Sequence, residues 1–162
     1  MWPALAGIGS LLGSGTAGFF FDASHRPTPW GYTDGGAWGE AWLDLAEAAG
    51  PRTMGLVEPP YHLKVPNPRV AVLTDIGVAS SGEAIAIAFR GRSNTMSFGT
   101  PTCGLSTEVE QFPLKSGGRI GIVTGVLADR TKRTYGDIVR PDELVSNPAD
   151  VVPRALAWLR RR

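Results

Sequence analysis

The segment from residue 69 to residue 89 constrains the fold of this chain more than any other stretch. Residues 69–74 (RVAVLT) form an apolar, largely β-branched run of strand length that follows Pro68. Such a run is typical of a strand covered on both faces, usually in a parallel sheet. A short turn at 75–79 then leads into 80–89 (SSGEAIAIAF), which predicts a helix beginning at a serine. A strand, a tight turn and a helix in this order predict a mixed α/β layer architecture.

Ser80 lies at the junction of turn and helix, and its local chemistry supports two interpretations. A serine with Glu83 three residues later matches the capping box of a helix N-terminus. The free N–H groups of a first helical turn can also stabilise an anion. Ser80 could therefore present its hydroxyl to a substrate carbonyl while the N–H of Ser81 faces the developing oxyanion. Spacing alone does not separate a cap from a nucleophile.

The rest of the chain predicts short elements and many loops, because it has 21 glycines and 13 prolines. A length of 162 residues predicts a single domain, 1–162. Expected helices span 2–13, 38–49 and 147–162, the last with Asp150 as a possible cap. Expected strands span 16–22, 69–74, 97–99, 111–114, 120–125 and 126–129, with a turn at 116–118. The proline- and glycine-rich segments 23–37 and 51–68 predict irregular structure.

Charge and composition argue against several classes of protein. Sixteen Lys and Arg against 15 Asp and Glu give a net charge of +1, without the basic excess of nucleic-acid-binding proteins. The single Cys103 excludes an internal disulfide, and two histidines argue against a multi-histidine zinc site. We therefore expect no metal. No apolar run predicts a membrane span, and the N-terminus lacks the basic region of a signal peptide, so the compartment stays open.

Four motifs, in order and at family-like spacing, resemble those of the tail-specific (C-terminal processing) serine peptidases. They are 72–75 (VLTD) with 78–84 (VASSGEA), 98–104 (FGTPTCG), 112–118 (FPLKSGG) and Pro141-Asp142 with Val145. The second is similar to the family's G-x-P-T-x-G loop. Each motif alone is weak, but the ordered set covers about residues 68–146. The start of the chain resembles the stretch that follows the family's D-L-R-x-N-x-G-G segment.

The resemblance implies a crotonase- or Clp-protease-like ββα spiral, incomplete at its N-terminus. It implies Ser80 as nucleophile, the Ser81 N–H as an oxyanion donor and Glu83 as a supporting polar residue. It also implies a peptide or protein substrate and no cofactor. The chain would be the C-terminal part of a catalytic domain. It would need the missing N-terminal half or self-association, because the absent strand would leave a sheet edge unpaired. Members of the family are often extracytoplasmic.

The general base does not follow from the resemblance. The best-known members use a lysine after G-x-P-T-x-G, but Leu105 stands there, and no lysine lies between Lys64 and Lys115. The sequence 104–107 (GLST) instead resembles the tricorn-like branch, which uses a histidine and an acidic partner. In that branch the histidine lies upstream of the D-L-R-x-N-x-G-G segment, which this chain does not contain.

Other bases and acids within the chain are therefore candidates. His25 and His62 lie in proline-rich loops and are expected to be exposed. The carboxylates considered as acidic partners are Asp137, Asp142 and Glu143, each of which also fits a solvated loop position.

Three functions remain open on the sequence. The first is a serine peptidase, as a truncated core without its upstream base. The second is a non-catalytic remnant that keeps Ser80 as a helix cap and binds peptide by strand addition. The third is an unrelated hydrolase that pairs Ser80 with His62, although the chain lacks the G-x-S-x-G elbow of the common α/β hydrolases.

Overall fold

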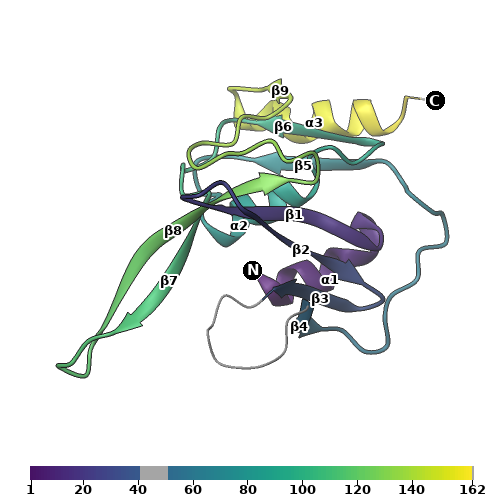
Figure 1. Ribbon diagram of the computed structural model, residues 1–162. Helices are drawn as coiled ribbons and strands as arrows, with labels where there is room; N and C mark the ends of the chain where they lie inside the picture. Colours follow the sequence, from purple (N-terminus) through teal and green to yellow (C-terminus); the bar gives the residue numbers. More distant parts are fainter. Residues whose placement is uncertain (41–50, 162) are drawn as a thin grey trace.

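Two sheets and three helices make up the computed structural model, which describes residues 1–40 and 51–161 (Figure 1). The larger sheet is antiparallel and has the order β4-β3-β2-β1-β8-β7. Its strands are β1 (Gly15–Asp22), β2 (Pro27–Thr33), β3 (Gly36–Glu40), β4 (Pro51–Leu56), β7 (Thr107–Pro113) and β8 (Arg119–Asp129). The smaller sheet is parallel, in the order β5 (Val70–Thr74), β6 (Thr95–Gly99) and β9 (Glu143–Leu144). The helices are α1 (Trp2–Leu12), α2 (Ser81–Ala88) and α3 (Pro148–Leu159).

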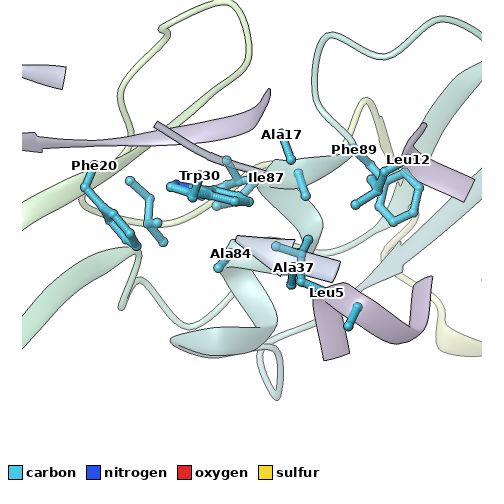
Figure 2. Packing of buried hydrophobic residues seen from close by; sticks show 13 residues of the cluster. Leu5, Leu12, Ala17, Phe20, Trp30, Ala37, Ala84, Ile87 and Phe89 are labelled. Carbon is cyan, nitrogen blue, oxygen red and sulfur yellow. The ribbon is translucent and has the colours of Figure 1, made fainter. Parts of the chain in front are cut away.

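The core lies where α1 and α2 pack against the larger sheet. Its buried residues come from both helices and from β1, β2, β3 and β8, and Figure 2 shows Leu5, Phe20, Trp30, Ala37 and Ile87 among them. Val70 and Val72 of β5 pack against the same cluster, so α2 also joins the two sheets. On the far side of the smaller sheet, α3 packs through Trp158, whose ring lies 6.0 Å from that of the buried Phe98. The result is a mixed α/β fold, as expected from the sequence.

The parallel pairing of β5 and β6 brings the start of the turn that leads to Ser80 beside the loop at 100–106. Thr74 pairs with Gly99 at the end of the ladder, and the Thr100 N–H donates to the Thr74 carbonyl at 3.0 Å. Gly99 has φ +124°, and a Cβ there would lie 2.0 Å from the Thr74 oxygen. Only glycine permits this approach of two backbones.

The prediction of irregular structure at 23–37 and 51–68 is wrong in part, because these segments contain β2, the first two residues of β3, and β4. Prolines at 27 and 29 are tolerated since the pairing of β2 with β3 begins only at Trp30. Before Trp30, the described residues give β2 a single neighbour, β1, so one side of its backbone has no ladder partner among them. Residues 38–40 of the expected helix at 38–49 belong to β3, and the remainder lies outside the described residues.

Two smaller expectations are also corrected. The cap of α3 is Asn147, whose Oδ1 accepts the Ala149 N–H at 3.2 Å, and not Asp150. Strand β5 packs against the core on one face and α3 on the other, but its cover is incomplete, because Leu73 is 45% exposed. Within the described residues, β5 also pairs on one side only.

The other expected elements are confirmed. The helix at 2–13, the strand at 16–22, the strand, turn and helix at 69–89, and the hairpin around 116–118 all form. In the parts of the chain that the structure describes, no helix has the length and apolar character needed to cross a membrane.

Candidate active site

Ser80 lies on a sharp turn between β5 and α2. The turn is held by Asp75, whose carbonyl accepts the Val78 N–H at 3.0 Å and whose Oδ1 accepts the Gly77 N–H at 2.8 Å. Ser80 itself has φ +50° and ψ −112°. A residue with a Cβ rarely adopts this conformation, which costs about 1–3 kcal/mol. Its side chain is exposed, so the strained backbone presents the hydroxyl to solvent at the start of a helix.

The capping-box residues Ser80 and Glu83 face each other in both directions, but the two contacts differ in strength. Glu83 Oε2 accepts the Ser80 N–H at 2.9 Å. The reciprocal contact, from the Ser80 side chain to the Glu83 N–H, falls short of a cap hydrogen bond. The Ser80 hydroxyl therefore faces the helix end without a full hydrogen bond to it.

Glu83 is fully buried and connects the start of α2 to the loop at 100–106. Its Oε1 accepts the Thr102 hydroxyl at 2.5 Å and the Gly104 N–H at 2.9 Å. Its Oε2 accepts the Leu105 N–H at 2.7 Å in addition to the Ser80 N–H. Four donors thus surround one carboxylate, which is how a buried charge is stabilised without a cation.

The loop at 100–106 is anchored at both ends as well. The Cys103 N–H donates to the Val78 carbonyl at 2.9 Å, and Thr102 Oγ1 accepts the Val139 N–H at 2.8 Å. Ser106 Oγ accepts the Gly136 N–H at 2.9 Å. The loop and the nucleophile turn therefore form one hydrogen-bonded unit.

A cleft of about 260 Å³ opens beside this unit. It is lined by Ser80, Ser81 and Ala84 of α2, Thr107, Glu108 and Val109 of β7, Phe20, Leu127, Met1 and Trp2. Glu108 is the one ionisable side chain among these residues. Burial, with a smaller contribution from the charge of Glu110, raises the pKa of Glu108 to about 7. The sequence does not point to Glu108, because no motif marks it and it lies before the expected strand at 111–114.

Neither candidate histidine lies at this cleft. His25 is exposed in the turn between β1 and β2, where its N–H donates to the Asp22 carbonyl at 2.9 Å. His62 is exposed beside a different cavity, together with Tyr32. Leu105, which stands where the lysine of the best-known family members is expected, is 52% exposed. Among the described residues that line the cleft there is no histidine or lysine.

The candidate carboxylates also lie elsewhere. Asp142 lines another cavity, where its Oδ2 accepts the N–H and the hydroxyl of Ser97 at 2.8 and 2.7 Å, and Arg90 pairs with its Oδ1 at 2.5 Å. Burial raises the pKa of Asp142, but the hydrogen bonds from Ser97 and the charge of Arg90 outweigh it, so the pKa is lowered overall. Glu143 lies 3.6 Å from Arg154.

Asp137, the third candidate, is exposed, and its side chain lies next to Gly104 of the anchored loop. The described residues 1–40 and 51–161 contain no cluster of three or more His, Cys, Asp or Glu side chains suited to a metal ion.

The site consists of a serine on a strained strand-to-helix turn in a mixed α/β fold. The chain belongs to peptidase family S41, whose model matches residues 43–145. This confirms the resemblance to tail-specific, C-terminal processing peptidases.

Three relatives show how far the likeness extends. The nisin-resistance protein of Lactococcus lactis subsp. lactis is 28% identical over 98 residues, covering 60% of this chain and 30% of that protein. A lipoprotein structure from Streptococcus agalactiae has a TM-score of 0.66 and 24% identity, covering 97% of this chain and 48% of that one. The photosystem II D1 C-terminal processing protease has a TM-score of 0.55 and 14% identity, covering 90% and 31%. The structural likenesses show the fold, and this chain spans less than half the length of each relative.

Proposed function

We propose that this chain carries the nucleophile of a serine peptidase, and that Ser80 is that nucleophile. The observation that carries the proposal is the strained Ser80 backbone, which holds an exposed hydroxyl, without a full cap hydrogen bond, at the wall of a cleft. Strain of this kind persists only where the surrounding structure enforces it, and the Glu83 network supplies that enforcement.

In the proposed reaction, Ser80 Oγ adds to the peptide carbonyl and its proton passes to a base. The carbonyl re-forms as the C–N bond breaks and the amine leaves with a proton. Water then hydrolyses the acyl-enzyme and restores Ser80. The described cleft residues include no histidine or lysine for this role. We propose that the base and a second oxyanion donor come from outside this chain, whose relatives are more than twice as long.

Ser81 is the proposed oxyanion donor within the chain. Its N–H lies in the first turn of α2, where no intrahelical acceptor exists, and the helix dipole favours negative charge there. Its hydroxyl is occupied differently, since it accepts from the amino nitrogen of Met1 at 3.1 Å. Glu83 is the proposed positioning residue, because its carboxylate joins the nucleophile turn to the loop at 100–106.

The finer assignments remain part of this proposal. The parallel unit β5-α2-β6 supports a crotonase-like spiral, and the sequence 104–107 supports the tricorn-like branch of the family. A peptide or protein is the proposed substrate.

A second function, peptide binding without catalysis, is favoured by one observation. No histidine or lysine lines the cleft among the described residues, and β7, whose Glu108 lines it, is an edge strand of its sheet. An edge strand can pair with an extended peptide.

Labelling with a fluorophosphonate probe separates the two functions, with imidazole added in solution as a mobile base. We expect weak labelling of the chain alone, and a rise of several-fold with imidazole that disappears in Ser80→Ala. Ser116→Ala, at the exposed tip of the β7–β8 hairpin, is the matched control and should label like the parent. Labelling that survives in Ser80→Ala overturns the nucleophile assignment. No labelling of a folded sample under either condition favours the binding function.

A further inference from the structure

Glu108 is a carboxylate for which the proposed reaction has no use. It lies on β7 and lines the same cleft as Ser80 and Ser81. Its Oε2 is buried, yet it has no hydrogen-bond partner within the described parts of the chain. Glu83, the other carboxylate near Ser80, accepts four hydrogen bonds, so the two groups serve different purposes.

An unpaired buried carboxylate is costly, because folding removes water and returns no partner. Burial indeed raises the pKa of Glu108 to about 7, and the nearby Glu110 adds to the effect. An apolar side chain could fill the same space without the free-energy cost of burying an unpaired carboxylate. The amino nitrogen of Met1 also lines the cleft, but it donates to Ser81 Oγ at 3.1 Å and not to Glu108. A cation that pairs with Glu108 would therefore come from outside the described residues.

The backbone beside Glu108 leaves room for its carboxylate, which lies over Gly125 next to the cleft. Gly125 of β8 stands opposite Glu108 in the hairpin register. A Cβ at Gly125 would lie 3.0 Å from Glu108 Oε2 and 2.9 Å from the Phe21 carbonyl. The register also shifts between Glu108 and Val109, so that these consecutive residues both reach the cleft.

The remaining lining suits the aliphatic part of a basic side chain. Apolar groups of Phe20, Ala84, Val109 and Leu127 form much of the wall, and Glu108 supplies the acidic group. Lysine and arginine have this combination, with methylene stems that pack on apolar surface and a cationic head that seeks a carboxylate.

We propose that Glu108 makes this cleft a binding site for a lysine or arginine side chain of the peptide that Ser80 attacks. The proposal names the substrate class of the site described above and rests on that proposed function for the role of Ser80. Binding itself needs neither the base nor the hydroxyl of Ser80, so it can be measured separately from catalysis.

The test is a calorimetric titration at pH 8 with two peptides, acetyl-Ala-Ala-Lys-Ala-Ala-amide and its norleucine counterpart. Norleucine keeps the four-carbon stem and removes the charge. We expect the lysine peptide to bind about tenfold more tightly, a difference in keeping with one charge-assisted pair (about 1.4 kcal/mol). Glu108→Gln, which preserves shape, should abolish the preference. Glu110→Gln removes the same charge two residues along β7 and should keep most of it.

Two outcomes overturn the proposal: equal binding of both peptides by the parent chain, or an unchanged preference in a Glu108→Gln variant whose thermal unfolding shows that it is folded. Ser80→Ala should retain the preference. A lysine preference without Ser80-dependent labelling would leave a site for basic peptides and remove the peptidase proposal. Labelling without a lysine preference would remove only the role of Glu108.

Discussion

At the scale of single residues, Ser80 combines two properties that a plain helix cap does not need. Its backbone is strained at φ +50°, and its hydroxyl makes no cap hydrogen bond. A cap works through its side chain and normally has an extended backbone. The conformation of Ser80 therefore favours presentation of the hydroxyl over closure of the helix.

Replacing Ser80 by glycine should relieve this strain, since glycine adopts positive φ at little cost. We expect Ser80→Gly to have a free energy of unfolding about 1 kcal/mol higher than Ser80→Ala, as measured by urea denaturation. Both variants lose the hydroxyl, so the comparison isolates the backbone.

The matched control for this comparison is Ser93, an exposed turn residue that is not among the positive-φ positions. There Ser93→Gly should be less stable than Ser93→Ala, because glycine raises the entropy of the unfolded chain and relieves no strain in the folded one. Equal stability of Ser80→Gly and Ser80→Ala would contradict the strain argument.

At the scale of elements, Glu83 holds α2 and the loop at 100–106 together. One carboxylate accepts N–H groups from Ser80, Gly104 and Leu105 and the hydroxyl of Thr102. Its position is set by α2, which follows directly from β5. The helix thus transmits the geometry of the parallel sheet to both sides of the candidate site.

Glu83→Ala should lower the free energy of unfolding by about 3 kcal/mol, because several donors lose their partner at once. Glu83→Gln should lower the free energy of unfolding by less. Its amide oxygen can still accept hydrogen bonds, although its NH₂ group would face donors. Urea denaturation measures both, and Glu110→Ala should change stability by less than about 0.5 kcal/mol. A change of that small size in Glu83→Ala would show that the loop does not depend on Glu83.

At the scale of the whole molecule, two carboxyl groups with opposite pKa shifts set the response to pH. Asp142 joins β6 to the segment before β9 and has a lowered pKa. Its contribution to the free energy of unfolding is therefore present at neutral pH and is lost in acid. Glu108 has a raised pKa of about 7, against 4.5 for an ordinary glutamate. Its contribution to the free energy of unfolding is present below pH 4.5, where the carboxyl is protonated, and is lost as the pH rises through 7.

Thermal unfolding across pH should expose this difference. The Tm of Glu108→Gln should match that of the parent near pH 4.5, exceed it increasingly up to about pH 7, and keep a constant excess above that. Asp142→Asn should show the opposite trend: its Tm should lie below that of the parent at neutral pH, and the difference should shrink in acid. If the difference in Tm between Glu108→Gln and the parent did not depend on pH, the carboxyl of Glu108 would not titrate in this range.

The whole molecule also presents surface that the described residues leave uncovered. The β7–β8 hairpin projects away from the rest of the fold (Figure 1), and it exposes Phe112, Leu114, Ile120, Ile122 and Val123. The free edge of β5 lies in the smaller sheet. The expectation that this chain needs a further segment or self-association remains a prediction.

The sequence by itself determined the strand, turn and helix that carry Ser80 and Glu83. These depend on local physics: a β-branched run, an Asp-led turn and a capping pair three residues apart. The same local signals marked the loop at 100–106 and the β7–β8 hairpin, and the ordered motifs indicated the family.

Only the tertiary structure decided the rest. The prolines and glycines in β2, β3 and β4 do not predict strands from the sequence. These strands form because neighbouring strands provide their backbone hydrogen-bond partners. The unpaired carboxylate of Glu108 and the cleft beside Ser80 are assembled from elements far apart in the chain. Burial, register and backbone strain are properties of such long-range contacts, so no pattern of neighbouring residues contains them.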